Sequence, residues 1–329
     1  MAGMGKRMRP HTLTVPKPLI PIAGKPIVQR LVEDIAQTTD EKIEEIAFIT
    51  GRFGKEVESG LISIAEKLGA KGKICYQDEP LGTAHAILCA GETVSGHIII
   101  AFADTLFKTD FKIDKEKDGV IWVNKVNDWQ NFGVVQLHTE GYIENFVEKP
   151  NQFVSDLAII GVYYIKDGDT LRKEMQYLLD NEIKEKGEYQ LTNALDAMRK
   201  NGYKFLPGKV DEWLDCGNKD ATVYTNQRIL ELKKDQEQFI SNTSKLINTQ
   251  IIAPCFIGEH VVIENSIIGP HVSIGKNSVL RNCVVQNSMI QEASTIQNKV
   301  LHNSMIGSHT NLLGVKEEYS LGDYSTEMN

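Results

Sequence analysis

The feature that most constrains the fold is a six-residue repeat in the last third of the chain. Aliphatic residues return at this spacing, often beside Gly or Asn, at Ile251, Ile257 and Ile263 and again at Ile268, Ile274 and Leu280. A chain can bury such residues along one line if it coils, with three hexads closing each triangular turn. The repeat therefore predicts a short left-handed parallel β-helix of three to four coils, with imperfect spacing near Val285 and Ile290.

The first two thirds of the chain carry a different pattern, in which apolar runs alternate with amphipathic segments. The apolar runs predict buried strands over 43–50, 73–77 and 97–107, and the amphipathic segments predict helices over 27–36 and 55–68. This alternation is typical of an α/β sheet with crossover helices. After residue 119 the runs become shorter and are separated by tight turns, which predicts hairpins and a mixed sheet.

These patterns divide a chain of 329 residues into four parts. We expect a doubly wound, Rossmann-like α/β domain over 1–225, a connecting helix over 226–245, the β-helix over 246–313 and an irregular tail over 314–329. A chain with 41% hydrophobic and 24% charged residues has the composition of an ordinary globular protein of about two domains.

Charge and residue usage argue against several classes of function. A net charge of −8 disfavours a nucleic-acid partner, because a phosphate backbone requires a basic face. The chain shows no long apolar run and no leader pattern, so we expect no membrane span and a cytoplasmic location. The cysteines lack C-x-x-C spacing and the histidines are spread singly, so the sequence predicts neither a zinc site nor a disulfide framework.

The first 26 residues form a cationic segment that cannot be a regular helix, because glycine and proline interrupt it. Gly3 and Gly5 let backbone N–H groups approach a phosphate without a Cβ in the way, and Arg7 supplies positive charge. Lys17 lies between two prolines, which stiffen the backbone of a group suited to neutralising charge in a transition state. The segment therefore predicts a polyphosphate-binding loop, and a basic surface loop is the alternative.

Two further positions follow predicted strands. Gln77 precedes a loop with Gly82 and Thr83, where an amide can read a pyrimidine edge and small residues let a flat ring approach the backbone. An ordinary strand-to-helix turn is the alternative. Asp104 follows the clearest apolar strand, at the carboxyl edge of the sheet, where an oxygen ligand suits Mg²⁺. A helix-capping aspartate is the alternative there.

Together these segments resemble the sugar-1-phosphate nucleotidylyltransferases, also called nucleoside-diphosphate-sugar pyrophosphorylases. Residues 3–26 are similar to the opening signature of that family, G-x-G-x-R-x-x-P followed by K-P-L-x-P-x-x-x-K-P. Residues 77–86 resemble its Q-x-x-x-L-G-T-A-x-A segment, and residues 213–217 match W-x-D-x-G. The matches follow the family order from residue 1 to about 220, and many members carry a hexad appendage like the one after Ser241.

The resemblance implies that the nucleotide is bound by Gly3, Gly5, Arg7, Lys17, Gln77, Gly82 and Thr83. Of these, Arg7 and Lys17 are implied to act at the reacting phosphates. Asp104 and Asp215 are implied to hold one Mg²⁺ between them, although a turn aspartate before glycine is the alternative for Asp215. An octahedral Mg²⁺ that keeps several waters needs only such a pair of carboxylates.

On the sugar side the resemblance implies a second set of residues, namely Gly133, Glu148, Lys149, Gly161 and Glu188. Gly133 would give close approach of the backbone to the sugar, and Glu148 would accept its hydroxyls. Lys149, in the sequence VEKP, would pair with the sugar phosphate.

The chain departs from the family pattern at three places. Ala103 stands where the family usually has the glycine of G-D, and Asn193 replaces the aspartate of G-E-x-x-L-T-D. In the family a hydrophobic strand runs directly into the glycine loop, whereas only Met1 and Ala2 precede Gly3 here. We therefore expect Met1 to be an internal methionine that follows an apolar, β-branched run of about five to ten residues.

The implied reaction joins a nucleoside triphosphate, dTTP or UTP by preference, to a sugar 1-phosphate, by preference glucose 1-phosphate, with release of pyrophosphate. We expect Mg²⁺ as cofactor and a homo-oligomer formed through the β-helix. One alternative is a non-catalytic regulatory subunit that binds sugar nucleotide without turnover. Another is a bifunctional enzyme with acyl transfer on the β-helix, for which His260 or His271 are the candidate residues.

Overall fold

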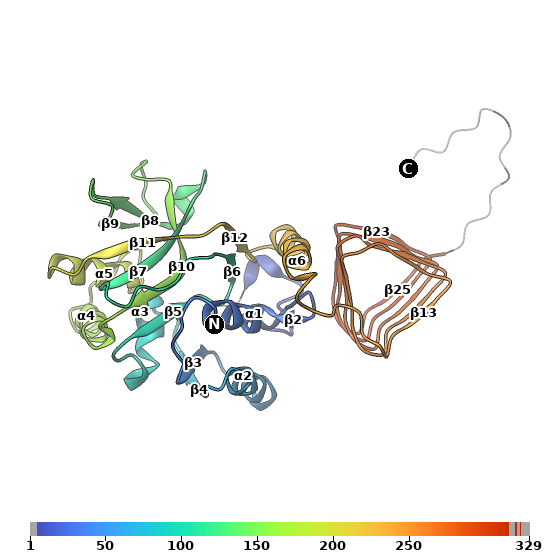
Figure 1. Cartoon of the computed structure of the whole chain (residues 1–329), viewed down its shortest axis with the longest axis horizontal. Coiled ribbons are helices and arrows are strands. Elements are labelled where there is room, and N and C mark those ends of the chain that lie inside the picture. Colours follow the sequence, from blue (N-terminus) through green and yellow to red (C-terminus); the bar gives the residue numbers. More distant parts are fainter. Residues whose placement is uncertain (1–4, 316–319, 321–322, 324–329) are drawn as a thin grey trace. The chain divides into compact units, whose positions relative to one another are not determined.

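The computed structural model describes residues 5–315, 320 and 323, and the chain divides into two compact units (Figure 1). Unit 1 consists of Met1–Ile20 and Lys25–Asn218, and unit 2 consists of Pro21–Gly24 and Lys219–Asn329. Within the described ranges, no helix is both long and apolar enough to cross a membrane.

The connecting helix predicted over 226–245 is wrong in its bounds. The helix of this region, α6 (Lys219–Lys233), begins earlier and belongs to unit 2. It ends in a turn in which the Gln236 N–H donates to the Lys233 carbonyl, and by Ile240 the chain forms a β-bridge with Ile257. The charged residues that suggested a longer helix continue into that turn, because charge patterning does not mark a helix end.

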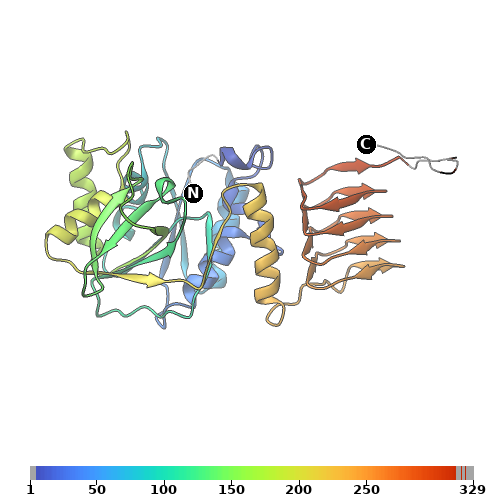
Figure 2. The ribbon, with the colours of Figure 1, turned by 90° about the horizontal axis from the view of Figure 1, so that it is seen from above.

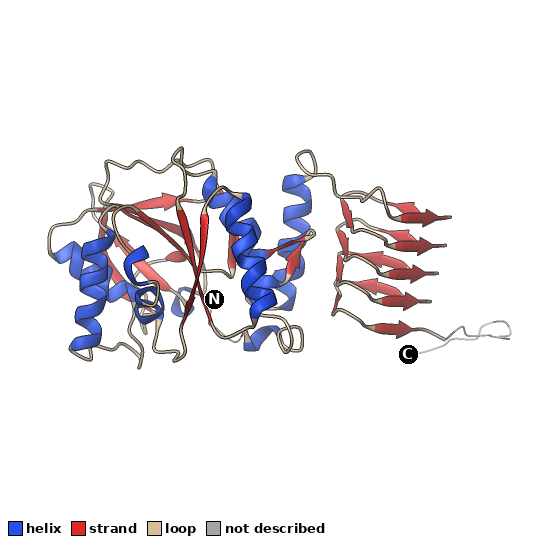
Figure 3. Ribbon diagram, turned by 90° about the horizontal axis from the view of Figure 1, so that it is seen from below, coloured by secondary structure: helices blue, strands red, loops and turns tan. Residues whose placement is uncertain are grey.

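Unit 1 is a mixed α/β domain, as predicted (Figure 3). Its helices are α1 (Ile27–Ala36), α2 (Lys55–Lys67), α3 (Thr83–Leu88), α4 (Gly168–Asp180) and α5 (Leu191–Lys200). Its strands are β2 (Lys25–Pro26), β3 (Glu45–Thr50), β4 (Lys71–Tyr76), β5 (Ile98–Ala101), β6 (Thr105–Lys108), β7 (Gly119–Lys125), β8 (Gly133–Leu137), β9 (Ile143–Glu148), β10 (Leu157–Ile165), β11 (Phe205–Lys209) and β12 (Glu212–Asp215).

The main sheet of unit 1 has the strand order β11-β7-β10-β8-β9, and β5 also pairs with β10. β11 runs parallel to β7, whereas β10 runs antiparallel to β5, β7 and β8. Two pairs lie outside this sheet: β3 with β4, which is parallel, and β6 with β12, which is antiparallel. The domain therefore combines crossover helices with hairpins such as β8–β9.

The single strand predicted over 97–107 is in fact two, β5 and β6, separated by Phe102–Asp104. An irregularity of the neighbouring strand lies beside the break. Gly161 adopts a φ of +84° at an irregularity of β10, and its carbonyl accepts the Phe102 N–H at 2.8 Å. The chain then turns, and β6 pairs with β12 rather than with the main sheet.

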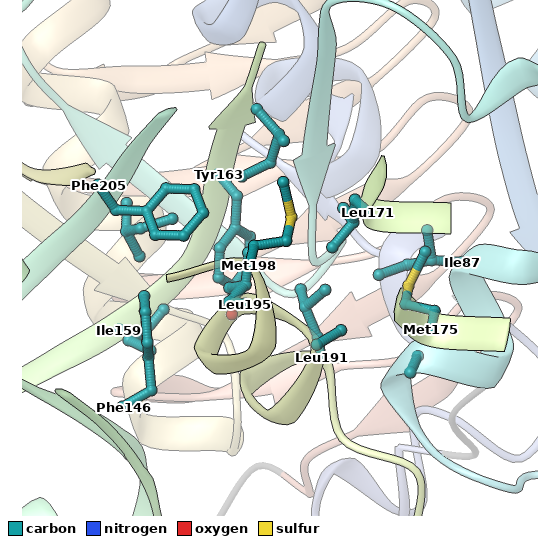
Figure 4. Packing of buried hydrophobic residues seen from close by; sticks show 14 of the residues in the cluster. Ile87, Phe146, Ile159, Tyr163, Leu171, Met175, Leu191, Leu195, Met198 and Phe205 are labelled. Carbon is teal, nitrogen blue, oxygen red and sulfur yellow. The ribbon is translucent and has the colours of Figure 1, made fainter. Parts of the chain in front are cut away.

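The core of unit 1 lies between the main sheet and helices α3, α4 and α5 (Figure 4). On α5, Leu191, Leu195 and Met198 recur at helical spacing and are buried against the sheet residues Ile159 and Tyr163. Burying one such side chain contributes roughly 1.5–3 kcal/mol, so this face holds α5 against the sheet.

Unit 2 contains β1 (Pro21–Ile22), α6 and a parallel β-helix, whose stacked coils are visible in Figure 2. The strands of the β-helix are β13 (Lys245–Ile247), β14 (Gln250–Ile251), β15 (Cys255–Ile257), β16 (Val262–Glu264), β17 (Ile267–Ile268), β18 (Val272–Ile274), β19 (Val279–Arg281), β20 (Val284–Gln286), β21 (Ser288–Ile290), β22 (Thr295–Gln297), β23 (Val300–His302), β24 (Met305–Ile306) and β25 (Asn311–Leu313). They form three parallel sheets, one for each face of the coil.

The repeat residues named above point inward, and Ile257, Ile263, Ile268, Ile274 and Leu280 are fully buried. The coil is shorter than the predicted three hexads, however. Lys245 pairs with Val262 and Val279 with Thr295, so one turn advances 17 and then 16 residues. The steps from Ile263 to Ile268 and from Leu280 to Val285 are pentads, which explains the spacing that looked imperfect in the sequence. Asparagines with positive φ, such as Asn265 and Asn282, stand at several corners, where that residue type tolerates the left-handed conformation.

The N-terminal piece of unit 2 packs inside that unit. The side-chain oxygen of Asn226 on α6 accepts hydrogen bonds from the Ala23 N–H at 2.9 Å and from the Ser273 hydroxyl at 2.7 Å. A Cβ at Gly24, where φ is +85°, would lie 2.2 Å from the Phe256 ring, so only glycine fits there. The predicted domain limits of 1–225 did not anticipate this assignment of residues 21–24.

Candidate active site

The glycine loop closes onto Lys17. Gly5 has a φ of +53°, and its carbonyl accepts the Thr12 hydroxyl at 2.8 Å and the Met8 N–H at 2.9 Å. A Cβ at Gly5 would lie 3.2 Å from the Lys17 Cβ, so the absence of a side chain allows this close approach. Gly3, the other predicted glycine, lies outside the described residues.

Lys17 is a buried cation held between Pro16 and Pro18. Its ammonium pairs with the Asp104 carboxylate at 3.0 Å, and the two side chains are 8% and 49% exposed. The ion pair therefore joins the glycine loop to the break between β5 and β6, and it leaves the aspartate open to solvent and to a ligand.

Asp215 comes to the same place from the far end of unit 1. It ends β12 opposite Thr105 on β6, and the Cys216 N–H donates to the Asp104 carbonyl at 3.1 Å. Burial raises the pKa of Asp215, and the negative charge of Asp104 raises it further, whereas Lys17, the Gly217 N–H and Arg7 lower it. Arg7 is thus within electrostatic reach of the pair, although its own side chain is exposed.

Aromatic side chains support the strand that carries Asp215. The Trp213 indole N–H donates to the Thr105 hydroxyl at 2.7 Å, which ties β12 to β6. The Phe132 ring contacts Trp213 edge-on, with ring centroids 5.1 Å apart. These contacts fix Asp215 relative to Asp104 without using either carboxylate.

The two aspartates fit a magnesium ion bound partly by its substrate. Over residues 5–315, no three or more His, Cys, Asp or Glu side chains gather as a ready-made metal cage. Mg²⁺ in phosphate-transfer sites commonly takes one or two carboxylates and completes its shell with phosphate oxygens and water. Burial, and to a lesser degree the charge of Asp104, disfavours the charged form of Asp215, and a bound cation would offset both effects.

The predicted base-recognition residues lie together at the start of α3. Gln77 follows β4, and its amide nitrogen donates to the Gly82 carbonyl at 3.1 Å and lies 3.0 Å from His85 Nδ1. Gly82 has a φ of +121°, and a Cβ there would lie 2.4 Å from the Tyr189 carbonyl oxygen. Packing against Tyr189 therefore explains why this position requires glycine.

The predicted sugar-side residues centre on Glu148. A Cβ at Gly133, its partner across the β8–β9 hairpin, would lie 2.9 Å from a Glu148 carboxylate oxygen, so the glycine makes room for that carboxylate. The Lys149 ammonium lies 3.6 Å from Glu148, and the Thr192 hydroxyl lies 3.4 Å from it. Burial raises the pKa of Glu148, while Lys149 and Thr192 lower it.

Two of the predicted sugar-side residues, Gly161 and Glu188, have other contacts in the structure. Gly161 is needed for backbone geometry, because a Cβ there would lie 2.8 Å from the Phe102 ring. Glu188 is exposed, and its carboxylate accepts the Gln190 side-chain amide at 3.2 Å. Within the described part of the chain, neither residue forms a hydrogen bond or an ion pair with the Glu148 carboxylate.

The first turn of α5 supports both the base side and the sugar side. The Thr83 hydroxyl accepts the Leu191 N–H at 2.9 Å and contacts the Gln190 side chain at 3.3 Å, while Thr192 contacts Glu148. We did not predict roles for Gln190, Thr192 or His85. The L-T of the segment resembling G-E-x-x-L-T-D was the available signal for Thr192, whereas His85 had only its place in the LGTAHA loop.

A glycine loop closed on a buried lysine, beside two carboxylates from distant strands, is the architecture of an α/β enzyme that handles polyphosphates. A family model described as Nucleotidyl transferase matches residues 1–231. The chain belongs to this family, and it is a sugar-phosphate nucleotidyltransferase. The resemblance to sugar-phosphate nucleotidylyltransferases and the predicted fold class are both confirmed.

Several curated proteins are similar over nearly the whole chain. The low-salt glycan biosynthesis nucleotidyltransferase Agl11 of Haloferax volcanii is 27% identical over 94% of this chain and 91% of its own length. A glucose-1-phosphate thymidylyltransferase of Streptomyces antibioticus is 27% identical over 98% and 96%, respectively. The bifunctional protein GlmU of Methanococcus vannielii is 28% identical over 93% and 75%. Among solved structures, a UDP-glucose pyrophosphorylase in complex with UDP-glucose has 25% identity and a TM-score of 0.57, over 70% of this chain and 96% of that one.

Proposed function

We propose that this enzyme transfers a nucleotidyl group from dTTP or UTP to glucose 1-phosphate and releases pyrophosphate. The observation that carries the proposal is the grouping of Lys17, Asp104 and Asp215 in a nucleotidyltransferase domain. A pyrimidine base is supported by the amide of Gln77 beside the α3 loop. Glucose and these two bases are also named in the thymidylyltransferase and UDP-glucose pyrophosphorylase to which the chain is similar.

In the proposed reaction an oxygen of the sugar phosphate attacks the α-phosphorus of the triphosphate. The new P–O bond forms in line with the bond between the α-phosphorus and the oxygen that bridges it to the β-phosphate. That bond breaks, and pyrophosphate leaves with its electron pair. Lys17 and Arg7 neutralise the charge that develops on the phosphate oxygens, and Lys149 orients the sugar phosphate. Glu148, which is largely buried and paired with Lys149, accepts hydrogen bonds from the sugar hydroxyls.

Asp104 and Asp215 are the residues that would hold Mg²⁺. When bound, Mg²⁺ withdraws charge from the phosphate oxygens and helps to align the triphosphate. Lys17 keeps Asp104 in place through its ion pair, and Trp213 keeps the strand of Asp215 against β6.

The bifunctional alternative rests on the Methanococcus relatives named GlmU and on the β-helix. In this chain one of its two candidate histidines is engaged, because His271 Nε2 lies 2.6 Å from a Glu231 carboxylate oxygen of α6. The β-helix therefore supports acyl transfer less directly than the grouping of Lys17, Asp104 and Asp215 supports nucleotidyl transfer.

The test is pyrophosphate release with Mg²⁺, across five nucleoside triphosphates and a panel of glucose, galactose, mannose and N-acetylglucosamine 1-phosphates. We expect the highest kcat/KM with dTTP or UTP and glucose 1-phosphate. A purine preference or another sugar would overturn the substrate assignment while leaving the reaction class intact. No release with any pair would favour the regulatory subunit, and transfer of an acetyl group from acetyl-CoA to an amino sugar phosphate would favour the bifunctional enzyme.

A further inference from the structure

The side-chain amide of Gln77 is held at its nitrogen end. Gln77 follows β4 and is 9% exposed. Its amide nitrogen donates to the Gly82 carbonyl at 3.1 Å and lies 3.0 Å from His85 Nδ1 on α3. An amide nitrogen carries two protons, so these two neighbours engage both of them. The donor end of the side chain is therefore fully used inside the protein.

The Gly82 carbonyl determines which way round the amide lies. A carbonyl oxygen can only accept, so it faces the amide nitrogen and not the amide oxygen. The same carbonyl also accepts the Ala86 N–H of α3 at 3.0 Å. With the Gln77 nitrogen fixed there, His85 Nδ1 accepts the second amide proton. The imidazole then carries its own proton on Nε2, the tautomer in which Nδ1 has a free lone pair.

The oxygen end of the amide is available to a ligand. Within residues 5–315, no group hydrogen-bonds to Gln77 Oε1. This oxygen is not sealed in the core, because the fully buried side-chain atoms that lack a partner among the described residues belong to Thr50, Trp122, Asn226 and Asn287. Gln77 therefore offers a ligand one group, a hydrogen-bond acceptor whose direction is already set.

Backbone bonds fix the surroundings of this amide but not its rotation. The Leu81 carbonyl accepts the Tyr189 N–H at 2.8 Å, and the Tyr189 carbonyl accepts the Ala84 N–H at 3.0 Å. These bonds position the loop that carries Gly82. Among the described residues, His85 supplies the one side chain that hydrogen-bonds to the Gln77 amide. His85 is thus the residue whose replacement can loosen the amide while leaving the backbone bonds in place.

A fixed acceptor discriminates between pyrimidines by the group at ring position 3. Uracil and thymine carry an N3–H there, which can donate to the Gln77 oxygen. Cytosine carries an unprotonated N3 at the same position, so its lone pair would face that oxygen. A site whose buried polar groups are left unpaired by the wrong substrate rejects that substrate strongly. A reversed amide would present an N–H to cytosine instead and would reverse the preference.

We propose that His85 is a positioning residue that selects the base. Its Nδ1 holds the Gln77 amide with the oxygen toward the nucleotide, so that uridine or thymidine triphosphate binds in preference to cytidine triphosphate. This assignment rests on the proposed function, in which Gln77 lies against a pyrimidine. It adds the residue that orients the amide to the residue that contacts the base.

The test compares His85→Leu with His85→Asn in the full chain. Both replacements branch at Cγ, as histidine does, but only asparagine can place an acceptor oxygen near the position of Nδ1. Binding of UTP and of CTP is measured by titration calorimetry with Mg²⁺ and without sugar phosphate. We expect the unmodified chain to prefer UTP, His85→Leu to lower the ratio of the two affinities about tenfold or more, and His85→Asn to restore most of it.

The matched control is His97→Leu, at an exposed histidine of the same unit whose Nδ1 lies 3.1 Å from the Tyr164 hydroxyl. It should leave the ratio of affinities unchanged. Equal weakening of both nucleotides in His85→Leu would overturn the proposal, because a purely structural contact does not distinguish the bases. An unchanged ratio in His85→Leu, or an equal loss in the Leu and Asn variants, would overturn it as well.

The unmodified chain provides a measurement that does not depend on how the variants fold. If it binds CTP more tightly than UTP, the amide oxygen does not face the base and the proposal is wrong. Binding is measured without turnover, so its outcome is separate from that of the pyrophosphate assay. Selective binding of UTP with no pyrophosphate release would contradict the proposed function and leave the role of His85 standing.

Discussion

The carboxylates of the candidate active site and those of unit 2 have pKa values shifted in opposite directions, whereas Glu45 and Asp167, elsewhere in unit 1, are lowered like those of unit 2. In unit 1, Asp215 and Glu148 have raised pKa values, chiefly because burial disfavours their charged forms. In unit 2, Glu231 and Asp220 have lowered pKa values, chiefly because His271 and Lys219, respectively, bond to them. Glu231 and Asp220 are satisfied within the fold, whereas the candidate active site holds carboxylates that a substrate or a cation has yet to satisfy. Such unsatisfied groups gather where ligands bind.

The two units also differ in the sequence separation of the residues that are in contact. In the β-helix each strand pairs with the strand one coil away, so its contacts repeat along the sequence. In unit 1, Lys17, Asp104 and Asp215 meet from three distant stretches of chain. The predictions below test whether chemistry resides in the long-range unit and assembly in the repeating one.

The largest effect should come from Asp215→Asn, which keeps the shape of the side chain and removes its charge. We expect turnover with Mg²⁺ to fall on the order of 10³-fold, because the metal and triphosphate lose a carboxylate partner. Asp104→Asn should act similarly. Pyrophosphate release under saturating substrates measures the effect, and Asp110→Asn, at an exposed aspartate of the same unit, is the control. Near-normal turnover of Asp215→Asn would contradict the assignment of Asp215 as a Mg²⁺ ligand.

The next effect should separate Lys149 from Lys17. We expect Lys149→Ala to raise the KM for sugar 1-phosphate about 10- to 100-fold, since a charge-assisted contact is lost, with a smaller change for the nucleotide. Lys17→Ala should instead lower kcat. Initial rates with each substrate varied in turn give both constants, and Lys125→Ala is the exposed-lysine control. Equal changes for both substrates in the two variants would contradict this division.

A smaller effect on chemistry is expected from removal of residues 246–329. Outward-facing aliphatic residues follow one face of the β-helix, where Ile267, Val284 and Val300 are aligned on successive coils and are 41%, 42% and 78% exposed. We expect the truncated chain to have a lower oligomeric state and to retain part of its nucleotidyl transfer. Light scattering together with the pyrophosphate assay checks this. A full-length chain that is monomeric at micromolar concentration would contradict assembly through the β-helix.

The smallest effect should be on stability, and its sign differs between the units. Because the folded-state pKa of Asp215 is raised, its contribution favours the folded state at low pH and is lost as pH rises from the ordinary value of 3.8 through the raised one. Asp215→Asn should therefore increase the melting temperature near neutral pH without Mg²⁺. The pKa of Glu231 is lowered, so its stabilisation is present above its ordinary value of 4.5 and is lost as pH falls through the lowered one. Glu231→Gln should decrease the melting temperature near neutral pH. Scans of both variants from about pH 2 to 8, which include both titration windows, test the two signs.

The sequence was most informative where structure depends on neighbouring residues. Helix α1 occupies the predicted 27–36, because Pro26 and the apolar spacing both act within that segment. The inward residues of the β-helix were identified for the same reason, while the coil length of 17 and then 16 residues depends on corner geometry that hexad counting does not include.

What could not be predicted depends on residues far away in the chain. The division of 97–107 into two strands occurs beside Gly161, whose carbonyl accepts the Phe102 N–H, and residues 21–24 contact Asn226 and Phe256 of unit 2. At the site, motif order located the predicted residues, but the engagement of the Gln77 amide by Gly82 and His85 became visible only in the fold. Roles for the site residues stay predictions until the variants above are measured.

The first turn of α5 connects the predicted base loop to the predicted sugar position. Leu191 is tied to Thr83 at the predicted base loop, and Thr192 to Glu148 at the predicted sugar position, one residue further along the same helix. A displacement of this turn cannot alter one position without altering the other. Thermodynamic reciprocity then applies. If bound nucleotide increases the affinity for the sugar phosphate, bound sugar phosphate increases the affinity for the nucleotide by the same factor. If the two predicted positions bind base and sugar, we expect substitutions in this turn that change the preferred base to change the selectivity for the sugar as well.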